Sequence, residues 1–196
     1  AKKNPYILGS EISKRNVVGF DINESRINEL MSGFDRTNEI EEGCINKLLS
    51  DKKLTLTSSI NGYENFDFFI VTVPTPIDHL KEPDLTPLKN ASINIGKLLK
   101  LRNSETKPII IFESTVFPGA TEDICAKLIQ KESGLKFNKD FYCGYSPERI
   151  NPGDKTHSLV DIKKITSGNN KSSAEWIKNF YGSIIKAGVY SAKTIK

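Results

Sequence analysis

The stretch DFFIVTV at residues 67–73 decides the fold class, because it is an almost unbroken apolar run. Such runs are typical of strands covered on both faces, as in parallel sheets. A second run, PIIIF at residues 108–112, has the same character. Between the two runs, apolar residues recur at the spacing of an amphipathic helix: Leu88, Ala91, Ile95, Leu98 and Leu99.

The same alternation extends toward the N-terminus. The run VVGF at residues 17–20 predicts a buried strand that ends at Asp21. Asn23 or Ser25 can cap a following helix, which Gly33 can end. The inner face of this helix carries Ile27, Leu30 and Met31. A helix over about 42–49, with Ile45, Leu48 and Leu49 inward, and a short strand over 54–57 are expected next.

Toward the C-terminus, the pattern predicts helices over 121–133 and 172–181, and strands over 141–145, 165–167 and 189–190. With right-handed crossovers this order gives an α/β fold, a doubly wound and mostly parallel sheet of the Rossmann type. We predict one domain over residues 1–196. A Gly-x-Gly-x-x-Gly turn should precede Asp21 by about 20 residues, but Gly9 stands too close. The first strand and its glycine turn are therefore expected to be missing.

Composition excludes several classes of function. The 196 residues carry a net charge of +4, with 37% hydrophobic and 27% charged residues, as in a globular protein. The absence of an apolar run of about 20 residues, or of a signal peptide, predicts a cytoplasmic protein without a membrane partner. Scattered lysines predict no nucleic-acid partner. Three cysteines without a C-x-x-C pair, and two histidines, predict reduced thiols and no metal site.

Three polar loops stiffened by proline follow the expected strands. They are VPTP at 73–76, ESTVFPG at 113–119 and YSPERINPGD at 145–154. In open α/β sheets, ligands bind at the carboxyl ends of the strands. We therefore expect the three loops and Asp21 to line one crevice at the rim of the sheet.

Each candidate also has a purely structural interpretation. Asp21 can accept hydrogen bonds from an adenosine ribose, with Arg26 beside it, or it can cap the next helix. The loop with Thr75 can border a nicotinamide ribose, or it can simply end a strand. The Thr115 hydroxyl can hold a water or a developing oxyanion, or serve a turn. Glu148 is a candidate base, and a surface salt bridge with Arg149 is the alternative.

Taken together, these motifs resemble the UDP-glucose/GDP-mannose dehydrogenase family, from about residue 17 to the C-terminus. The motifs are residues 17–23, 73–78, 113–119 and 145–154. The form SPERINPGD at 146–154 is most similar to the branch that acts on UDP-N-acetylhexosamines. The resemblance implies a cytoplasmic enzyme of surface-polysaccharide synthesis that oxidises the sugar C6 alcohol to a carboxylate with two NAD⁺, through a thioester on a cysteine.

The resemblance also implies roles for particular residues. Asp21 and Arg26 would hold the adenosine ribose, and Val73, Pro74 and Thr75 would line the NAD site. Thr115 would contact the cofactor and assist catalysis, and Glu148 would act on the water that hydrolyses the thioester. Residues at the sugar would be Glu148, Arg149, Ile150 and Asn151.

The family's nucleophilic cysteine, catalytic lysine and asparagine belong to later domains, and Cys44, Cys125 and Cys143 do not match the nucleophile's motif. We therefore expect the N-terminal NAD-binding domain of a larger homodimeric dehydrogenase, inactive by itself, with a UDP-sugar as the parent's substrate. The alternative is a non-catalytic nucleotide-binding or interaction module that lost the glycine turn.

Overall fold

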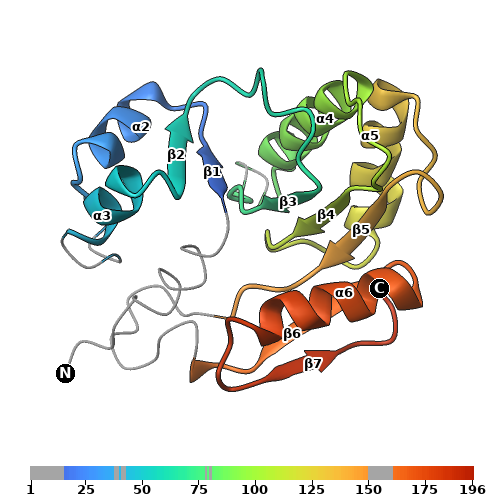
Figure 1. Ribbon diagram of the computed structural model, residues 1–196. Helices are drawn as coiled ribbons and strands as arrows, with labels where there is room; N and C mark the ends of the chain where they lie inside the picture. The colour runs from blue at the N-terminus through green and yellow to red at the C-terminus, as the bar shows by residue number, and fades with distance from the viewer. Residues whose placement is uncertain (1–15, 38–39, 41–42, 78, 80, 150–160) are drawn as a thin grey trace. The chain divides into compact units, whose positions relative to one another are not determined.

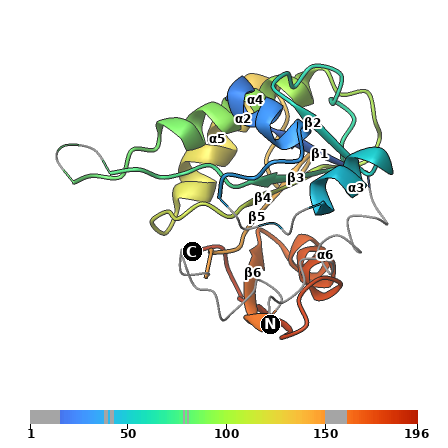
Figure 2. The ribbon, with the colours of Figure 1, turned by 90° about the vertical axis from the view of Figure 1, so that its left-hand side faces the viewer.

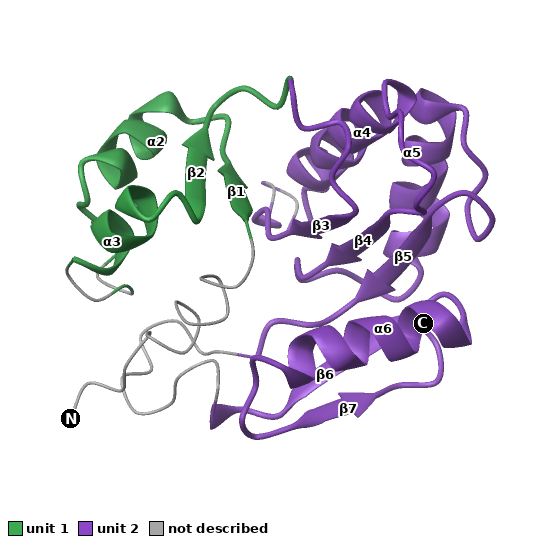
Figure 3. Cartoon of the chain, in the orientation of Figure 1, with its two compact units in different colours: residues 1–61 green, residues 62–196 purple. Residues whose placement is uncertain are grey.

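The computed structural model describes residues 16–37, 40, 43–77, 79, 81–149 and 161–196. The chain divides into two compact units, Ala1–Asn61 and Gly62–Lys196 (Figure 3). Residues 1–15, where a first strand and its glycine turn would fall, lie outside the described residues. The prediction that both are missing is therefore not decided. The assignment of a single domain to 1–196 likewise stays a prediction.

The first unit contains a two-stranded parallel sheet and two helices. Strand β1 (Val17–Phe20) pairs with β2 (Leu54–Thr57), and the helices are α2 (Glu24–Met31) and α3 (Cys44–Ser50). As predicted, an asparagine caps α2: the Asn23 side chain accepts a hydrogen bond from the backbone N–H of Arg26 at 3.1 Å.

The inner face of α2 is narrower than its sequence pattern suggests. Ile27 is buried and Leu30 half-buried, but Met31 is 56% exposed. The prediction that Met31 faces inward is therefore wrong. Met31 is the last residue of α2, and the chain turns away at Ser32 and Gly33 before anything covers it.

The second unit contains a five-stranded sheet in the order β3-β4-β5-β6-β7. The first three strands are parallel to one another, β6 runs antiparallel to β5, and β7 runs parallel to β6. This pattern confirms the mostly parallel sheet. The strands are β3 (Phe68–Val71), β4 (Ile109–Phe112), β5 (Tyr142–Tyr145), β6 (Lys164–Gly168) and β7 (Val189–Ser191).

Helices cover both faces of this sheet. Helix α4 (Thr86–Lys100) and a π-helical segment (Ala120–Cys125) that continues into α5 (Ala126–Ser133) pack on the face with Ile110 and Phe112. Helix α6 (Lys171–Gly182) packs on the opposite face, against Ile109 and Ile111 (Figures 1 and 2). Because successive strand residues point to opposite faces, β4 supplies both cores, and the sheet is doubly wound.

One local prediction fails in the second unit, and one is confirmed with an irregular start. Strand β3 was expected to be covered on both faces, but Ile70 is 42% exposed, because β3 is the edge strand of this sheet. The predicted helix over 121–133 is confirmed, and its first part, Ala120–Cys125, is π-helical, a form that is frequent near functional sites.

Candidate functional site

A pocket of about 190 Å³ lies in the second unit where β3, β4 and β5 end. Parallel strands present their carboxyl ends at one edge of a sheet, which is where α/β proteins bind ligands. Three loops, one after each strand, contribute the lining residues: Thr72, Val73, Pro74 and Thr75; Glu113, Ser114 and Thr115; and Glu148.

The loops after β3 and β4 are joined below the pocket. The backbone N–H of Glu113 donates to the carbonyl of Val71 at 2.8 Å and extends the ladder one residue beyond β4. The buried Ser114 hydroxyl then donates to the carbonyl of Val73 at 2.6 Å. Ser114 therefore serves to hold the loops together, and Thr115 is the exposed hydroxyl beside it.

Thr75 presents a hydroxyl oxygen that is buried and has no hydrogen-bond partner among the described residues. A buried hydroxyl without a partner costs about 1–3 kcal/mol, so most buried hydroxyls are paired. Pro74 and Pro76 restrict the backbone on both sides. Thr75 is one of the residues that line the pocket.

Glu148 is exposed and is oriented by its own loop. Its Oε1 accepts the backbone N–H of Arg149 at 2.6 Å. The loop itself starts at the fully buried Ser146, whose hydroxyl donates to the carbonyl of Ile165 at 2.8 Å. A carboxylate on a loop anchored in this way can act on a water or a hydroxyl that enters the pocket.

A buried polar cluster lies behind the pocket and consists of Glu113, Lys164 and Tyr181. Lys164 Nζ donates to Glu113 Oε2 at 2.8 Å, and the Tyr181 hydroxyl donates to Glu113 Oε1. The side chains of Lys164 and Glu113 are only 3% and 12% exposed. Lys164 Nζ also lies 5.5 Å from the centre of the Tyr181 ring, a cation–π contact.

The environment of Tyr181 keeps its hydroxyl protonated. Burial raises its pKa far above the ordinary value for tyrosine, and the charge and the hydrogen bond of Glu113 raise it further. The charge of Glu148 contributes in the same direction, which indicates that this carboxylate lies within electrostatic reach of the Tyr181 hydroxyl. Tyr181 is thus a constant hydrogen-bond donor to Glu113.

Sequence reasoning missed Lys164 and Tyr181. In the sequence, Lys164 follows Lys163 at the start of a mixed strand, which is typical of a solvated end. Tyr181 has the spacing of an ordinary core residue after Ile177. Only the antiparallel return of β6 beside β5, and the packing of α6 on the sheet, bring both to Glu113.

In the first unit, Asp21 follows β1 directly and is exposed. Its Oδ1 accepts the backbone N–H of Asn23 at 2.8 Å, and its own N–H donates to the carbonyl of Thr57 at 3.2 Å. The helix cap is Asn23, so Asp21 supports the turn that presents the cap.

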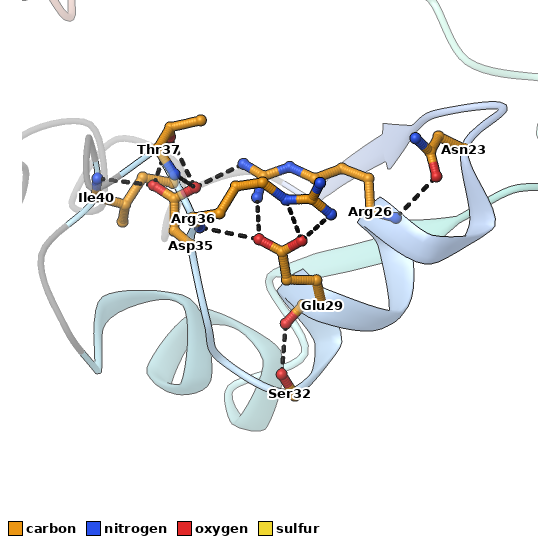
Figure 4. A network of polar contacts seen from close by, with 8 residues as sticks. All are labelled: Asn23, Arg26, Glu29, Ser32, Asp35, Arg36, Thr37 and Ile40. Atoms are coloured by element: carbon orange, nitrogen blue, oxygen red, sulfur yellow. Dashed lines mark hydrogen bonds and ion pairs between the residues drawn. The ribbon is translucent and has the colours of Figure 1, made fainter.

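Arg26 belongs to a polar network that joins α2 to the loop after it (Figure 4). Its guanidinium donates to Glu29 Oε1 at 2.7 Å and to Asp35 Oδ1 at 2.6 Å. Arg36 pairs with Glu29, and Asp35 accepts hydrogen bonds from Thr37. Burial opposes ionisation of Asp35, but the hydrogen bonds from Arg26 and Thr37 outweigh it and hold the pKa at about 2.

The structure thus brings together part of the predicted site. Val73, Pro74, Thr75, Thr115 and Glu148 line one pocket, and the exposed Arg149 adjoins it in sequence. Asp21 and Arg26 belong to the first unit. Ile150 and Asn151 lie outside the described residues. The functional roles of all these residues remain predictions.

The three thiols are not part of the pocket. Cys44, Cys125 and Cys143 are all buried, and none of them lines the pocket. Burial raises the pKa of Cys125 to about 11 and that of Cys143 well above its ordinary value, so both stay as thiols. Cys143 is part of the apolar core, as its sequence context predicted.

Metal and membrane features are missing from the part of the chain that the structure describes. Within it, no group of three or more histidine, cysteine, aspartate or glutamate side chains could hold a metal ion. None of the helices described there combines the length and apolar character needed to cross a membrane.

Known proteins resemble this chain over most of its length. UDP-N-acetyl-D-glucosamine 6-dehydrogenase of Pseudomonas aeruginosa is 51% identical over 183 residues, which are 93% of this chain and 42% of that protein. Protein CapL of Staphylococcus aureus is 47% identical over 184 residues, which are 94% of this chain and 41% of that protein. This chain therefore spans about two fifths of the length of these relatives.

The fold agrees with solved structures. UDP-D-ManNAc dehydrogenase from Pyrococcus horikoshii superposes with a TM-score of 0.82 at 29% identity, over 97% of this chain and 45% of that one. This match confirms the Rossmann-like α/β fold. The NAD binding domain of the UDP-glucose/GDP-mannose dehydrogenase family matches residues 6–185, so the chain belongs to that family.

Proposed function

We propose that this chain is the cofactor-binding part of an NAD-dependent nucleotide-sugar 6-dehydrogenase. The complete protein would oxidise the C6 alcohol of a UDP-N-acetylhexosamine to the uronate, for surface-polysaccharide synthesis. One observation carries the proposal: in a member of this family, Thr75, Thr115 and Glu148 line one pocket at the carboxyl ends of three parallel strands. The close relative named for UDP-N-acetyl-D-glucosamine supports the choice of sugar.

The residues of the pocket fit one end of the cofactor. A volume of about 190 Å³ is below the range of about 300–1,000 Å³ for sites that enclose a whole ligand. It suits the nicotinamide end alone. The Thr75 hydroxyl, which has no partner among the described residues, would hydrogen-bond to it, beside Val73 and Pro74, while Asp21 and Arg26 would hold the adenosine ribose. Bound NAD⁺ supplies the hydride acceptor of the reaction.

The remaining pocket residues would handle protons and charge. Thr115 is exposed beside the buried Ser114, so its hydroxyl would hold a water or donate to an oxyanion. Glu148 would position the hydrolytic water and accept its proton. The backbone of Arg149 to Asn151 would border the sugar. Glu113 is unsuited to act as a base, because Lys164 and Tyr181 occupy both of its oxygens.

For the complete protein we propose a cytoplasmic homodimer with a UDP-sugar substrate and neither a nucleic-acid nor a membrane partner. The family's known relatives of about twice this length support an enzyme with further domains. Those domains would supply the cysteine nucleophile, since the three cysteines here are buried and none of them lines the pocket.

The proposal is tested on the complete protein by NADH formation with UDP-N-acetylglucosamine, UDP-N-acetylgalactosamine and UDP-glucose. We expect oxidation of at least one N-acetylhexosamine and a weaker reaction with UDP-glucose. Absence of NADH formation with all three would contradict the proposal.

The cofactor site is tested by NAD⁺ calorimetry with Thr75→Val, which removes the hydroxyl and keeps the shape. We expect about a tenfold loss of affinity, the equivalent of one hydrogen bond of about 1.4 kcal/mol. The matched control is Thr55→Val on the exposed face of β2. Equal affinities for Thr75→Val and Thr55→Val would remove Thr75 from the site.

A further inference from the structure

The loop that carries Glu148 is attached to the end of β4 at both of its ends. At the first end, the backbone N–H of Ser146 donates to the carbonyl of Phe112 at 3.0 Å, and its hydroxyl donates to Ile165. At the second end, Lys164 donates to Glu113, the residue directly after β4. Both attachments converge on the short segment that leads from β4 to Thr115.

The backbone of Lys164 is also held in place, by the neighbouring strand. Lys164 is the first residue of β6, and its backbone N–H donates to the carbonyl of Gly188 at 3.1 Å, in line with the pairing to β7. The partner Tyr181 is on α6, whose neighbours Ile177 and Ile185 belong to the same buried core. The three side chains of the cluster thus come from three parts of the same packed unit: the residue after β4, the first residue of β6, and α6.

The charge of Lys164 also matters to the pocket. Glu113 and Glu148 both line it, so the pocket contains two carboxyl groups. Lys164 and Tyr181 turn both oxygens of Glu113 toward the core and neutralise one of the two negative charges. Without the ammonium group, the Glu113 carboxylate would stay without its cation in a pocket that Glu148 also lines, which disfavours the present arrangement of the two loops.

We propose that Glu113, Lys164 and Tyr181 are positioning residues, which hold the Glu148 loop against the Thr115 loop and so set the spacing of the two reactive side chains. The inference rests on the proposed function, in which Thr115 and Glu148 act on the same reacting groups. A displacement of about 1 Å of a reacting group can lower a rate by about 10²-fold. Lys164 and Tyr181 do not line the pocket, and Glu113 lines it with both of its oxygens bonded to them, so the effect of the cluster in this scheme is on geometry.

The first test is steady-state kinetics of the complete protein with Lys164→Met and Tyr181→Phe. We expect kcat to fall by about 10- to 100-fold while KM for NAD⁺ and for the UDP-sugar changes less than about twofold. The charge-reversed double variant Glu113→Lys/Lys164→Glu should recover at least about tenfold in kcat over Lys164→Met. The matched control is Lys127→Met, which breaks an exposed pair with Asp123 of 3.8 Å and should leave kcat unchanged.

A wild-type kcat in folded Tyr181→Phe and Lys164→Met proteins would overturn the proposal, because the cluster would then serve stability alone. Failure of the charge-reversed variant to exceed Lys164→Met would overturn the role of the ion pair.

A second test does not depend on turnover. Backbone amide NMR signals of Thr115 and Glu148 in this chain should move in Tyr181→Phe, a variant that loses one hydroxyl, and stay in place in Lys127→Met. Unchanged Thr115 and Glu148 signals in Tyr181→Phe would refute positioning. If the wild-type complete protein forms no NADH, the proposed function fails. The NMR signals of Thr115 and Glu148 still test whether the cluster positions the two loops.

Discussion

The two compact units differ in the size of their apolar cores and of their sheets. In the described part of the first unit, the buried apolar side chains are Ile27, Cys44 and Ile45, and its sheet has two strands. The second unit has a five-stranded sheet with an apolar core on each face. An isolated two-stranded sheet is at best marginally stable, whereas a larger sheet packed by helices is stable by burial.

The polar networks of the two units differ in the same way. The first unit uses Arg26, Glu29, Asp35 and Arg36 at a partly exposed surface to order the loop after α2 (Figure 4). The second unit places Glu113, Lys164 and Tyr181 inside. Exposed ion pairs contribute little to folding stability because water and salt screen them. The loss of one partner from a buried pair lowers the stability much more, because it leaves a buried charge unpaired. The comparison therefore predicts that single substitutions in the two units lower the free energy of unfolding by graded amounts.

The largest effect is expected from Phe112→Ala at the end of β4. Phe112 is fully buried in the core beneath α4 and α5, so truncation leaves a cavity and lowers the free energy of unfolding by about 4 kcal/mol. Urea denaturation followed by fluorescence measures it, because the single tryptophan, Trp176, is on α6 of the same unit. A loss below about 1 kcal/mol would show that this core is loosely packed.

Lys164→Met comes next. It leaves Glu113 buried without its cation, and we expect the second unit to lose about 3 kcal/mol of unfolding free energy. The double variant Glu113→Leu/Lys164→Met removes both charges and should regain most of the loss. Equal stability of the single and double variants would mean that the unpaired carboxylate carries no penalty.

Asp35→Asn tests the first unit and is expected to cost about 1 kcal/mol. The wild-type carboxyl has a lowered pKa of about 2, so its contribution is complete above the ordinary value of about 4. It is lost as the pH falls from about 4 to about 2. Amide NMR shifts of Thr37 and Ile40, which both donate to Asp35, should report this titration. A midpoint near 4 at these amides would refute the network.

The smallest effect is expected from Arg36→Met. Arg36 pairs with Glu29, but its side chain is 53% exposed, so the change in unfolding free energy should be the smallest of the series and close to zero. Added salt should reduce even this difference. A loss comparable to that of Lys164→Met would erase the distinction between the two networks.

Most of the fold could be predicted from periodicity. The runs at β3 and β4 and the apolar stripe of α4 are strong signals, because strands covered by helices and a helix packed on one face require them. The errors fall at margins, where the sequence does not show what covers a residue: Met31 at a helix end and Ile70 on an edge strand are exposed. The π-helical turn at Ala120 left no trace in the pattern either.

By itself, the sequence determined the alternating α/β order, the parallel core strands and the polar loops at three strand ends, since each depends on residues close together in the chain. Only the tertiary structure decided that the Thr75 hydroxyl is buried without a partner in the described part of the chain, that Ser114 joins two loops, and that Lys164 and Tyr181 meet Glu113. Lys164 and Tyr181 lie 51 and 68 residues beyond Glu113, and no local pattern records a contact over such separations. Those contacts depend on how the strands and helices pack, which is the step that brings distant side chains into one environment.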